Sequence, residues 1–234
     1  MSMSNTDRLT RRLRAEWRLK LGLTLALNVW CWLPYQWLQR HHYFPARELA
    51  GHALDHWIPF LPHTVWLYLS IYVFLPLPPL LLGERRQLLR YGAGFAAFSL
   101  AGCLAFLFWP TTCPRPSVAD APLLYRALTQ LDNPFHAFPS LHAASALYTA
   151  ACAERVRREL AGGWPWRVGS WLWTALILVA TLTTKQHLTS DIIAGGALGL
   201  VMFHLFFRAS PALVPAAPAP EMSGPPANPN PSLQ

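Results

Sequence analysis

The chain has 234 residues, of which 53% are hydrophobic and only 13% are charged, with 11 tryptophans and a formal net charge of +8. Together with a mean hydropathy of +0.23, this composition is too apolar for an ordinary soluble domain and indicates a protein with several membrane spans. No basic-aromatic motif or zinc-finger spacing accompanies the positive charge, so a nucleic-acid-binding protein is not expected.

Six apolar stretches approach the roughly 20 residues that a helix needs to cross a bilayer. We predict spans at residues 19–37, 57–82, 91–109, 140–153, 164–184 and 191–207. The fourth is short, and the second contains four prolines, which a spanning helix tolerates where neighbouring groups satisfy the freed carbonyls. The sequence therefore predicts an all-α, integral membrane six-helix bundle over residues 19–208.

The two ends of the chain differ from this predicted membrane domain. Residues 1–18 are basic and are expected to form a cytoplasmic N-terminal segment. Residues 209–234 are rich in Pro and Ala and almost uncharged, which predicts a disordered tail. The four cysteines lack CxxC spacing and three lie in predicted spans, so no disulfide framework is expected.

Basic residues gather on one side of the predicted bundle. They precede the first span, separate the second from the third and separate the fourth from the fifth: Arg8, Arg11, Arg12, Arg14, Arg18, Lys20, Arg85, Arg86, Arg90, Arg155, Arg157, Arg158 and Arg167. The positive-inside rule makes this side the cytoplasm, with both termini there. Segments 38–56, 110–139 and 185–190 would then meet on the opposite face, in the periplasm or exterior.

Two of these outer segments carry paired polar residues beside apolar stretches. One is FPSLH at residues 138–142, and the other is KQHLTSD at residues 185–191. In the second, His187 precedes Asp191 by four residues, so a helix beginning there would bring the carboxylate within one turn of the imidazole. The convergence of these segments on one face indicates an active site for phosphoryl transfer at the membrane surface.

A phosphate ester resists attack because its oxygens are negative, so a catalyst needs fixed positive charge and hydrogen-bond donors around phosphorus. Arg115 offers a planar fork for two oxygens, and Lys185 offers a point charge. The helix expected to begin near Ser140 offers its N-terminal amides. We expect these three residues to bind the substrate phosphate.

The two histidines are the candidate catalytic groups. His187, oriented through Nδ1 by Asp191, would attack phosphorus with Nε2. His142 would protonate the leaving oxygen and then remove a proton from the acceptor. Water as acceptor gives hydrolysis, and a lipid or polyol hydroxyl gives transfer. Because no acidic cluster accompanies the histidines, we expect neither a metal ion nor a cofactor.

These residues also have structural interpretations. The histidines could bond to carbonyls at the interface, and Arg115 and Lys185 could merely flank the spans. Ser140 could simply cap a helix, which is compatible with phosphate binding at the same terminus. Asp191 is different, because an acid at the edge of an apolar span is costly and usually functional.

The same segments resemble a known family. PSLH at residues 139–142 resembles the second signature of the type 2 phosphatidic acid phosphatase (PAP2) superfamily, and HLTSDIIAG at residues 187–195 resembles the end of its third. The strings AFPSLH and TKQH are most similar to the branch with inositol phosphorylceramide synthases and their bacterial relatives. The resemblance covers roughly residues 85–207. It implies a bundle of the PAP2/haloperoxidase type in a bacterial inner membrane, with a phosphohistidine intermediate.

The chain departs from the family pattern at two cationic positions. Where the third signature has Ser-Arg, this chain has Ala180 and Thr181, and where the first has Lys, it has Phe108. The Arg-Pro of the first signature is present at Arg115 and Pro116. Lys185 is close to His187 in sequence and is a candidate replacement for one of the missing cations.

Three functions stay open at this stage. The leading one is a lipid-phosphate phosphatase or phosphotransferase, with a lipid phosphate or diphosphate as substrate. The second is a dedicated headgroup transferase of the inositol phosphorylceramide synthase type. The third is a noncatalytic membrane protein or transporter, although a transporter would place polar residues near the middle of the bilayer. The lipid, the acceptor and the oligomeric state are left undecided.

Overall fold

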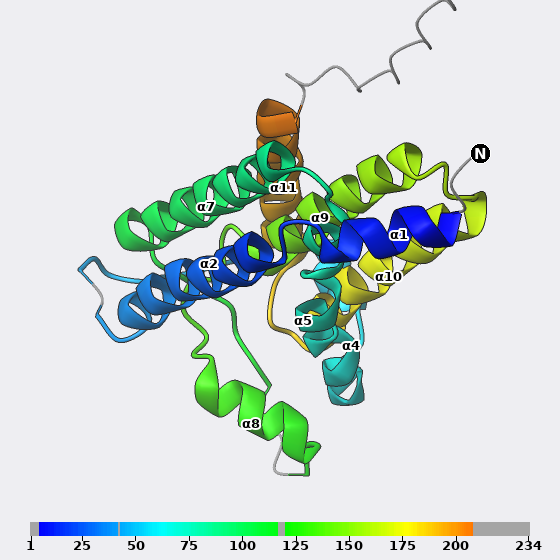
Figure 1. Ribbon diagram of the computed structural model, residues 1–234. Helices are drawn as coiled ribbons and strands as arrows, with labels where there is room; N and C mark the ends of the chain where they lie inside the picture. The colour runs from blue at the N-terminus through cyan, green and yellow to red at the C-terminus, as the bar shows by residue number, and fades with distance from the viewer. Residues whose placement is uncertain (1–4, 42, 117–119, 208–234) are drawn as a thin grey trace, which may run out of the picture.

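The computed structural model describes residues 5–41, 43–116 and 120–207, and these are mostly helical, as predicted (Figure 1). The helices are α1 (Asn5–Arg14), α2 (Trp17–Leu38), α3 (Ala53–Trp57), the 3-10 helix η1 (Pro62–Thr64), α4 (Val65–Leu69), α5 (Ile71–Phe74), α6 (Leu77–Leu81), α7 (Arg85–Phe108), α8 (Leu123–Leu131), α9 (Leu141–Glu159), α10 (Trp164–Thr183) and α11 (Thr189–Phe207). Two short strands, β1 (Arg47–Glu48) and β2 (Thr111–Thr112), pair in parallel. The tail at residues 209–234 lies outside the described residues.

Helical structure occupies every stretch predicted to span the membrane. Within the described residues, three helical segments are long and apolar enough to cross a bilayer: Pro62–Leu81, Arg85–Phe108 and Thr189–Phe207. These three helices indicate that the chain is a membrane protein. That the chain crosses the membrane six times stays a prediction. Three boundaries differ from expectation, because the helical part of the second stretch begins at Pro62, α7 begins at Arg85 and α9 continues to Glu159. Arg, Gln and Glu favour helix, so α7 and α9 both extend beyond their apolar stretches into polar residues.

The second predicted span is broken into η1, α4, α5 and α6. Proline has no N–H, so Pro79 leaves the carbonyl of Leu75 without its usual helical donor. The hydroxyl of Tyr91 on α7 donates to this carbonyl at 3.2 Å. At the break between α4 and α5, Ser70 Oγ accepts a hydrogen bond from the indole of Trp173 at 2.9 Å. Neighbouring helices therefore satisfy polar groups that the interruptions expose.

Helices α9 and α11 pack closely at two glycines of α11. A Cβ atom at Gly195 would lie 2.0 Å from the carbonyl oxygen of Ser140, and one at Gly199 would lie 2.2 Å from that of Ala144. Only glycine allows this approach of the two backbones. The contact brings the start of α9 against the start of α11, where the amide of Ser140 donates to the carbonyl of Asp191 at 3.1 Å.

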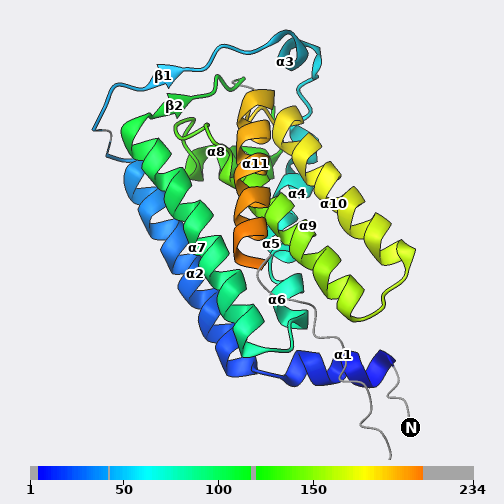
Figure 2. The same cartoon turned by 90° about the horizontal axis from the view of Figure 1, so that it is seen from above.

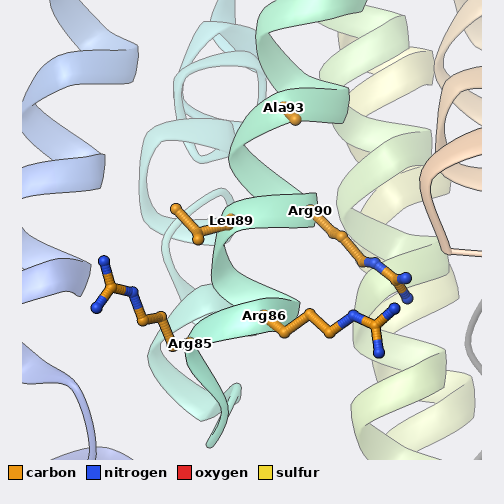
Figure 3. A pocket seen from close by; sticks show the side chains of 5 residues that line it. All are labelled: Arg85, Arg86, Leu89, Arg90 and Ala93. Carbon is orange, nitrogen blue, oxygen red and sulfur yellow. The ribbon is translucent and has the colours of Figure 1, made fainter.

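The basic segments meet at one end of the bundle. Arg12 of α1 and Arg155 of α9 both pair with Glu159, at 3.1 and 3.2 Å. Nearby, the first turns of α7 carry three arginines around a shallow surface pocket, with Arg86 and Arg90 directed to the same side of the helix (Figure 3). Figure 2 shows α1 at this end, and β1, β2 and α3 at the opposite end.

Candidate active site

His187 lies in the segment between α10 and α11, at the end of the bundle opposite α1. Its Nδ1 is 3.0 Å from the carbonyl oxygen of Ala137. A carbonyl oxygen accepts but cannot donate, so this hydrogen bond requires the proton on Nδ1 and leaves the lone pair on Nε2. The ring is therefore held in the tautomer that a nucleophilic Nε2 needs.

Asp191 lies in the first turn of α11, next to this ring. Its Oδ2 is 3.7 Å from Nδ1 of His187, which is close enough for charge stabilisation but too long for a hydrogen bond. The carboxylate is instead drawn to its own turn, where Oδ2 accepts from the amide of Leu188 at 2.8 Å and Oδ1 from the hydroxyl of Ser190 at 3.2 Å. The carbonyl of Ala137, and not the carboxylate of Asp191 as expected, thus accepts the hydrogen bond from Nδ1 of His187.

His142 is the second residue of α9, and Tyr68 of α4 holds it in two ways. The rings stack with centroids 3.9 Å apart, and Nε2 of His142 is 3.0 Å from the carbonyl oxygen of Tyr68. This contact places a proton on Nε2 and leaves Nδ1 for proton exchange. The two histidines thus keep opposite ring nitrogens unengaged by these hydrogen bonds.

Ser140 caps α9, which is the structural role foreseen for it. Its Oγ accepts a hydrogen bond from the amide of Ala143 at 3.1 Å, and the residue is fully buried. The hydroxyl is therefore already engaged, and any contribution to phosphate binding would come from the amides of the first helical turn.

Arg115 is held by an acidic residue that sequence reasoning missed. Its Nη2 lies 3.2 Å from Oδ2 of Asp132, and its Nη1 donates to the backbone carbonyl of the same residue. Oδ1 of Asp132 also accepts from the hydroxyl of Tyr35 at 2.6 Å and from the side-chain amide of Gln39 at 2.5 Å. Asp132 belongs to no motif, so only the fold reveals its place. The Nε of Arg115 is buried and has no hydrogen-bond partner within the described ranges.

Lys185 fastens the His187 segment to the loop around α3. Its ammonium donates to the carbonyls of Asp55 and Ile58, at 3.0 and 2.7 Å. The carboxylate of Asp55 in turn accepts from the amide of Thr189 at 2.8 Å and from its hydroxyl. Burial alone would raise the pKa of Asp55, but the hydrogen bonds from Thr189 and from the amide of His52 lower this pKa below its usual value.

The three outer segments therefore meet, as predicted. The pairing of β1 with β2 joins residues 38–56 to residues 110–139, with Arg47 opposite Thr111. The hydrogen bond between His187 and Ala137 joins residues 110–139 to residues 185–190. The hydrogen bond from Lys185 to the carbonyl of Asp55 joins residues 185–190 to residues 38–56. The position of His187 consequently depends on contacts among all three segments.

His142 and His187 line one cavity of about 400 Å³, together with Tyr68, Asp132 and a third histidine, His136. The other predicted site residues are not among its lining residues: Arg115, Ser140, Lys185 and Asp191. The structure thus brings the two catalytic candidates to a shared space, with Asp191 behind one of them. Arg115 reaches this space only through its pairing with Asp132.

His136 was not singled out from the sequence, although it directly precedes the AFPSLH string. It is buried and stacked on Phe106, with ring centroids 4.9 Å apart. Its backbone φ of 68° is in the left-handed region, which is uncommon outside glycine. Within the part of the chain that the structure describes, no three His, Cys, Asp or Glu side chains are grouped so as to hold a metal ion.

Chemically, this arrangement pairs an imidazole lone pair with a second imidazole suited to proton exchange, facing one cavity. A family model described as the PAP2 superfamily matches residues 36–205, which include both histidine segments and Arg115. No curated protein and no solved structure matches the chain at a significant level.

Proposed function

Because the chain belongs to the PAP2 superfamily, for which a phosphatase-type function is expected, we propose that it transfers the phosphoryl group of a lipid phosphate or diphosphate through a phosphohistidine. The observation that carries this proposal is the pair of histidines at one cavity, His187 with Nε2 unengaged and His142 with Nδ1 unengaged. Two histidines with purely structural roles would not need to keep different ring nitrogens unengaged at the same cavity.

In the first step, Nε2 of His187 attacks phosphorus and the bond from phosphorus to the lipid oxygen breaks. His142, which enters this step with protons on both ring nitrogens, gives its Nδ1 proton to the departing oxygen and keeps the proton on Nε2, so the alcohol leaves neutral. The imidazole of His187 gains positive charge in this step, and Asp191, at 3.7 Å, stabilises that charge.

In the second step, His142 removes a proton from the acceptor, which attacks phosphorus and releases His187. Water as acceptor yields phosphate, and a lipid or polyol hydroxyl yields a new ester. We propose that both steps need no metal ion, because proton transfer and the fixed donors of the site supply the stabilisation.

We further propose that the site faces the periplasm or exterior of a bacterial inner membrane, with both termini in the cytoplasm. This proposal is supported by the positions of the basic N-terminal segment and the histidine segments at opposite ends of the bundle. The salt bridges of Arg12 and Arg155 to Glu159 lie at one end, and the histidine segments lie with β1 and β2 at the other (Figure 2).

A dedicated headgroup transferase is the second candidate, and the small number of free cations at the cavity favours it. Arg115 is already paired with Asp132, and the ammonium of Lys185 is bound to carbonyls. Phe108 and Thr181 occupy positions where the family pattern has cations. A phosphate monoester carries about −1.5 to −2 charges near pH 7, whereas a diester carries about −1, so a weakly cationic site suits a diester better.

The deciding experiment incubates the purified protein in detergent with lipid monoesters, diphosphates and diesters of matched chains, with and without a polyol acceptor. Free phosphate and new lipids are both followed, in chelator, and acid-labile phosphate on the protein is measured. We expect turnover in chelator and its loss in His187→Ala. Absence of turnover and of phosphoprotein with every lipid would favour the noncatalytic or transport alternative instead.

A further inference from the structure

The cavity at the histidines is far longer than a phosphate requires. On α2 its lining residues recur on one face from Gln36 down to Thr24, which at 1.5 Å per residue corresponds to about 18 Å along the helix. On the opposite wall it continues from Tyr68 on α4 to Pro79 on α6. It therefore extends about 18 Å from the histidine end of the bundle, which is more than half of the roughly 30 Å thickness of a hydrocarbon core.

The character of the lining changes along this length. Near the histidines it includes the polar groups of Asp132, Tyr35 and Gln36. The walls are mostly apolar side chains from several helices: Leu27, Ile71, Leu75, Phe95, Phe106 and Leu141. Toward the deep end, the α2 wall also includes the polar residues Asn28 and Thr24. A polar head and a long apolar body match the shape and polarity of an amphiphile.

The dimensions also fit such an occupant. A volume of about 400 Å³ along a length of about 18 Å is large enough to hold an extended hydrocarbon chain.

We propose that the cavity binds one hydrocarbon chain of the lipid substrate along α2, with its phosphate at the histidine pair, and that the deep end around Thr24 and Pro79 limits chain length. This inference rests on the proposed function, because the phosphate is what fixes the chain's head at the histidines. It adds a substrate subsite that the family signatures do not contain.

Thr24→Phe tests the deep end, with Leu25→Phe as its matched control. Thr24 lines the cavity, whereas the neighbouring Leu25 is 59% exposed on the outer surface of α2. Turnover is measured on octyl and hexadecyl phosphates and on their methyl diesters. We expect Thr24→Phe to lower kcat/KM for the hexadecyl substrate by about tenfold while leaving the octyl substrate nearly unchanged. Asn28→Phe, one turn closer to the histidines, should shift the limit toward shorter chains. Leu25→Phe should match the wild-type protein with both.

A second readout does not depend on turnover. The wild-type protein is labelled with hexadecyl phosphate that carries a photoreactive group at the chain terminus, and the crosslinked residues are mapped by mass spectrometry. We expect labels at the deep end, around Thr24 and Pro79. Labels there without turnover would support the chain site and count against the proposed function. Turnover with no chain-length effect in Thr24→Phe, or labels confined to the outer surface, would overturn the chain site alone.

Discussion

His142 and Tyr68 are in contact through both ring and backbone, with ring planes only 10° from parallel and a hydrogen bond from Nε2 to the Tyr68 carbonyl. They are 74 residues apart in the chain. Tyr68 lies just before the break between α4 and α5, so the interruption of the second span occurs where the side chain of His142, a proposed catalytic residue, is positioned. A misplacement of this ring by about 1 Å could cost about 10²-fold in rate.

The first prediction follows from this contact. Tyr68→Ala should lower kcat by at least about tenfold, because the ring of His142 loses the surface that fixes its orientation. Tyr68→Phe is the control, since it keeps the stacked ring and the backbone carbonyl. Steady-state kinetics on purified protein provides the measurement. Equal kcat values for Tyr68→Ala and Tyr68→Phe would show that the stacking does not position His142.

The pairing of Asp132 with Arg115 gives the second prediction. Asp132→Asn removes a negative charge 3.2 Å from the guanidinium and should raise kcat/KM for lipid monoesters relative to diesters, because the freed charge attracts the more negative substrate. Asp120→Asn, at an exposed position of the same outer segment, is the control. The ratio of the two kcat/KM values is the quantity to compare, and an unchanged ratio in Asp132→Asn would contradict this role.

Several features of this site follow from sequence, whereas others depend on long-range contacts. Apolar stretches with flanking arginines locate the helices, because hydrophobicity and charge act locally along the chain. The pair of His187 and Asp191 is visible for the same reason, being four residues apart. Asp132 and Tyr68 lie in no motif, and only folding brings them to Arg115 and His142.

A local sequence pattern also does not show which of several possible hydrogen-bond acceptors a side chain will bind in the folded protein. The spacing in HLTSD correctly places a carboxylate beside His187, but the nearer acceptor is a carbonyl 50 residues away in the chain. Likewise, the charge of Lys185 suggests phosphate binding, yet the fold presents it with two carbonyls of the loop near α3. Backbone carbonyls are available at every residue, so sequence alone does not show which of them will bind a cation or a ring nitrogen.

The third prediction concerns the loop held by Asp55. Asp55→Asn should lower the free energy of unfolding by about 1–2 kcal/mol, because the hydrogen bonds to Thr189 and to the amide of His52 lose their charge. Thermal unfolding in detergent measures the difference, and Glu48→Gln, at an exposed position on β1, serves as control.

This difference should depend on pH in a defined direction. The pKa of Asp55 in the folded protein lies below its ordinary value of 3.8, so its stabilising effect is complete above that value and is lost as the pH falls through the lower folded pKa. The difference in the free energy of unfolding between the wild-type protein and Asp55→Asn should therefore stay constant from about pH 8 to about pH 5 and become smaller below about pH 4. A gap that widened on acidification would contradict the assignment.

The fourth prediction concerns the contact between α9 and α11. Gly195→Ala should lower the free energy of unfolding by about 1–3 kcal/mol or more, because its Cβ would lie 2.0 Å from the backbone oxygen of Ser140. Gly169→Ala is the control, since a Cβ there meets nothing within 4 Å. If the two variants unfold at the same temperature, the close approach of these helices is not required for stability.

The last prediction separates the two histidines by the chemistry of the leaving group. His187→Ala should abolish the phosphoprotein with every substrate, because no other nitrogen at the cavity is expected to form the covalent bond. His142→Ala should be slow with alkyl phosphates, whose alkoxide leaving group needs a proton, but much less impaired with an aryl phosphate that leaves unaided. Rapid-quench measurement of the phosphoprotein and of the released alcohol follows both steps. Equal losses of His142→Ala with alkyl and aryl substrates would contradict its assignment as the acid, and a normal rate in His187→Ala would contradict the phosphohistidine mechanism itself.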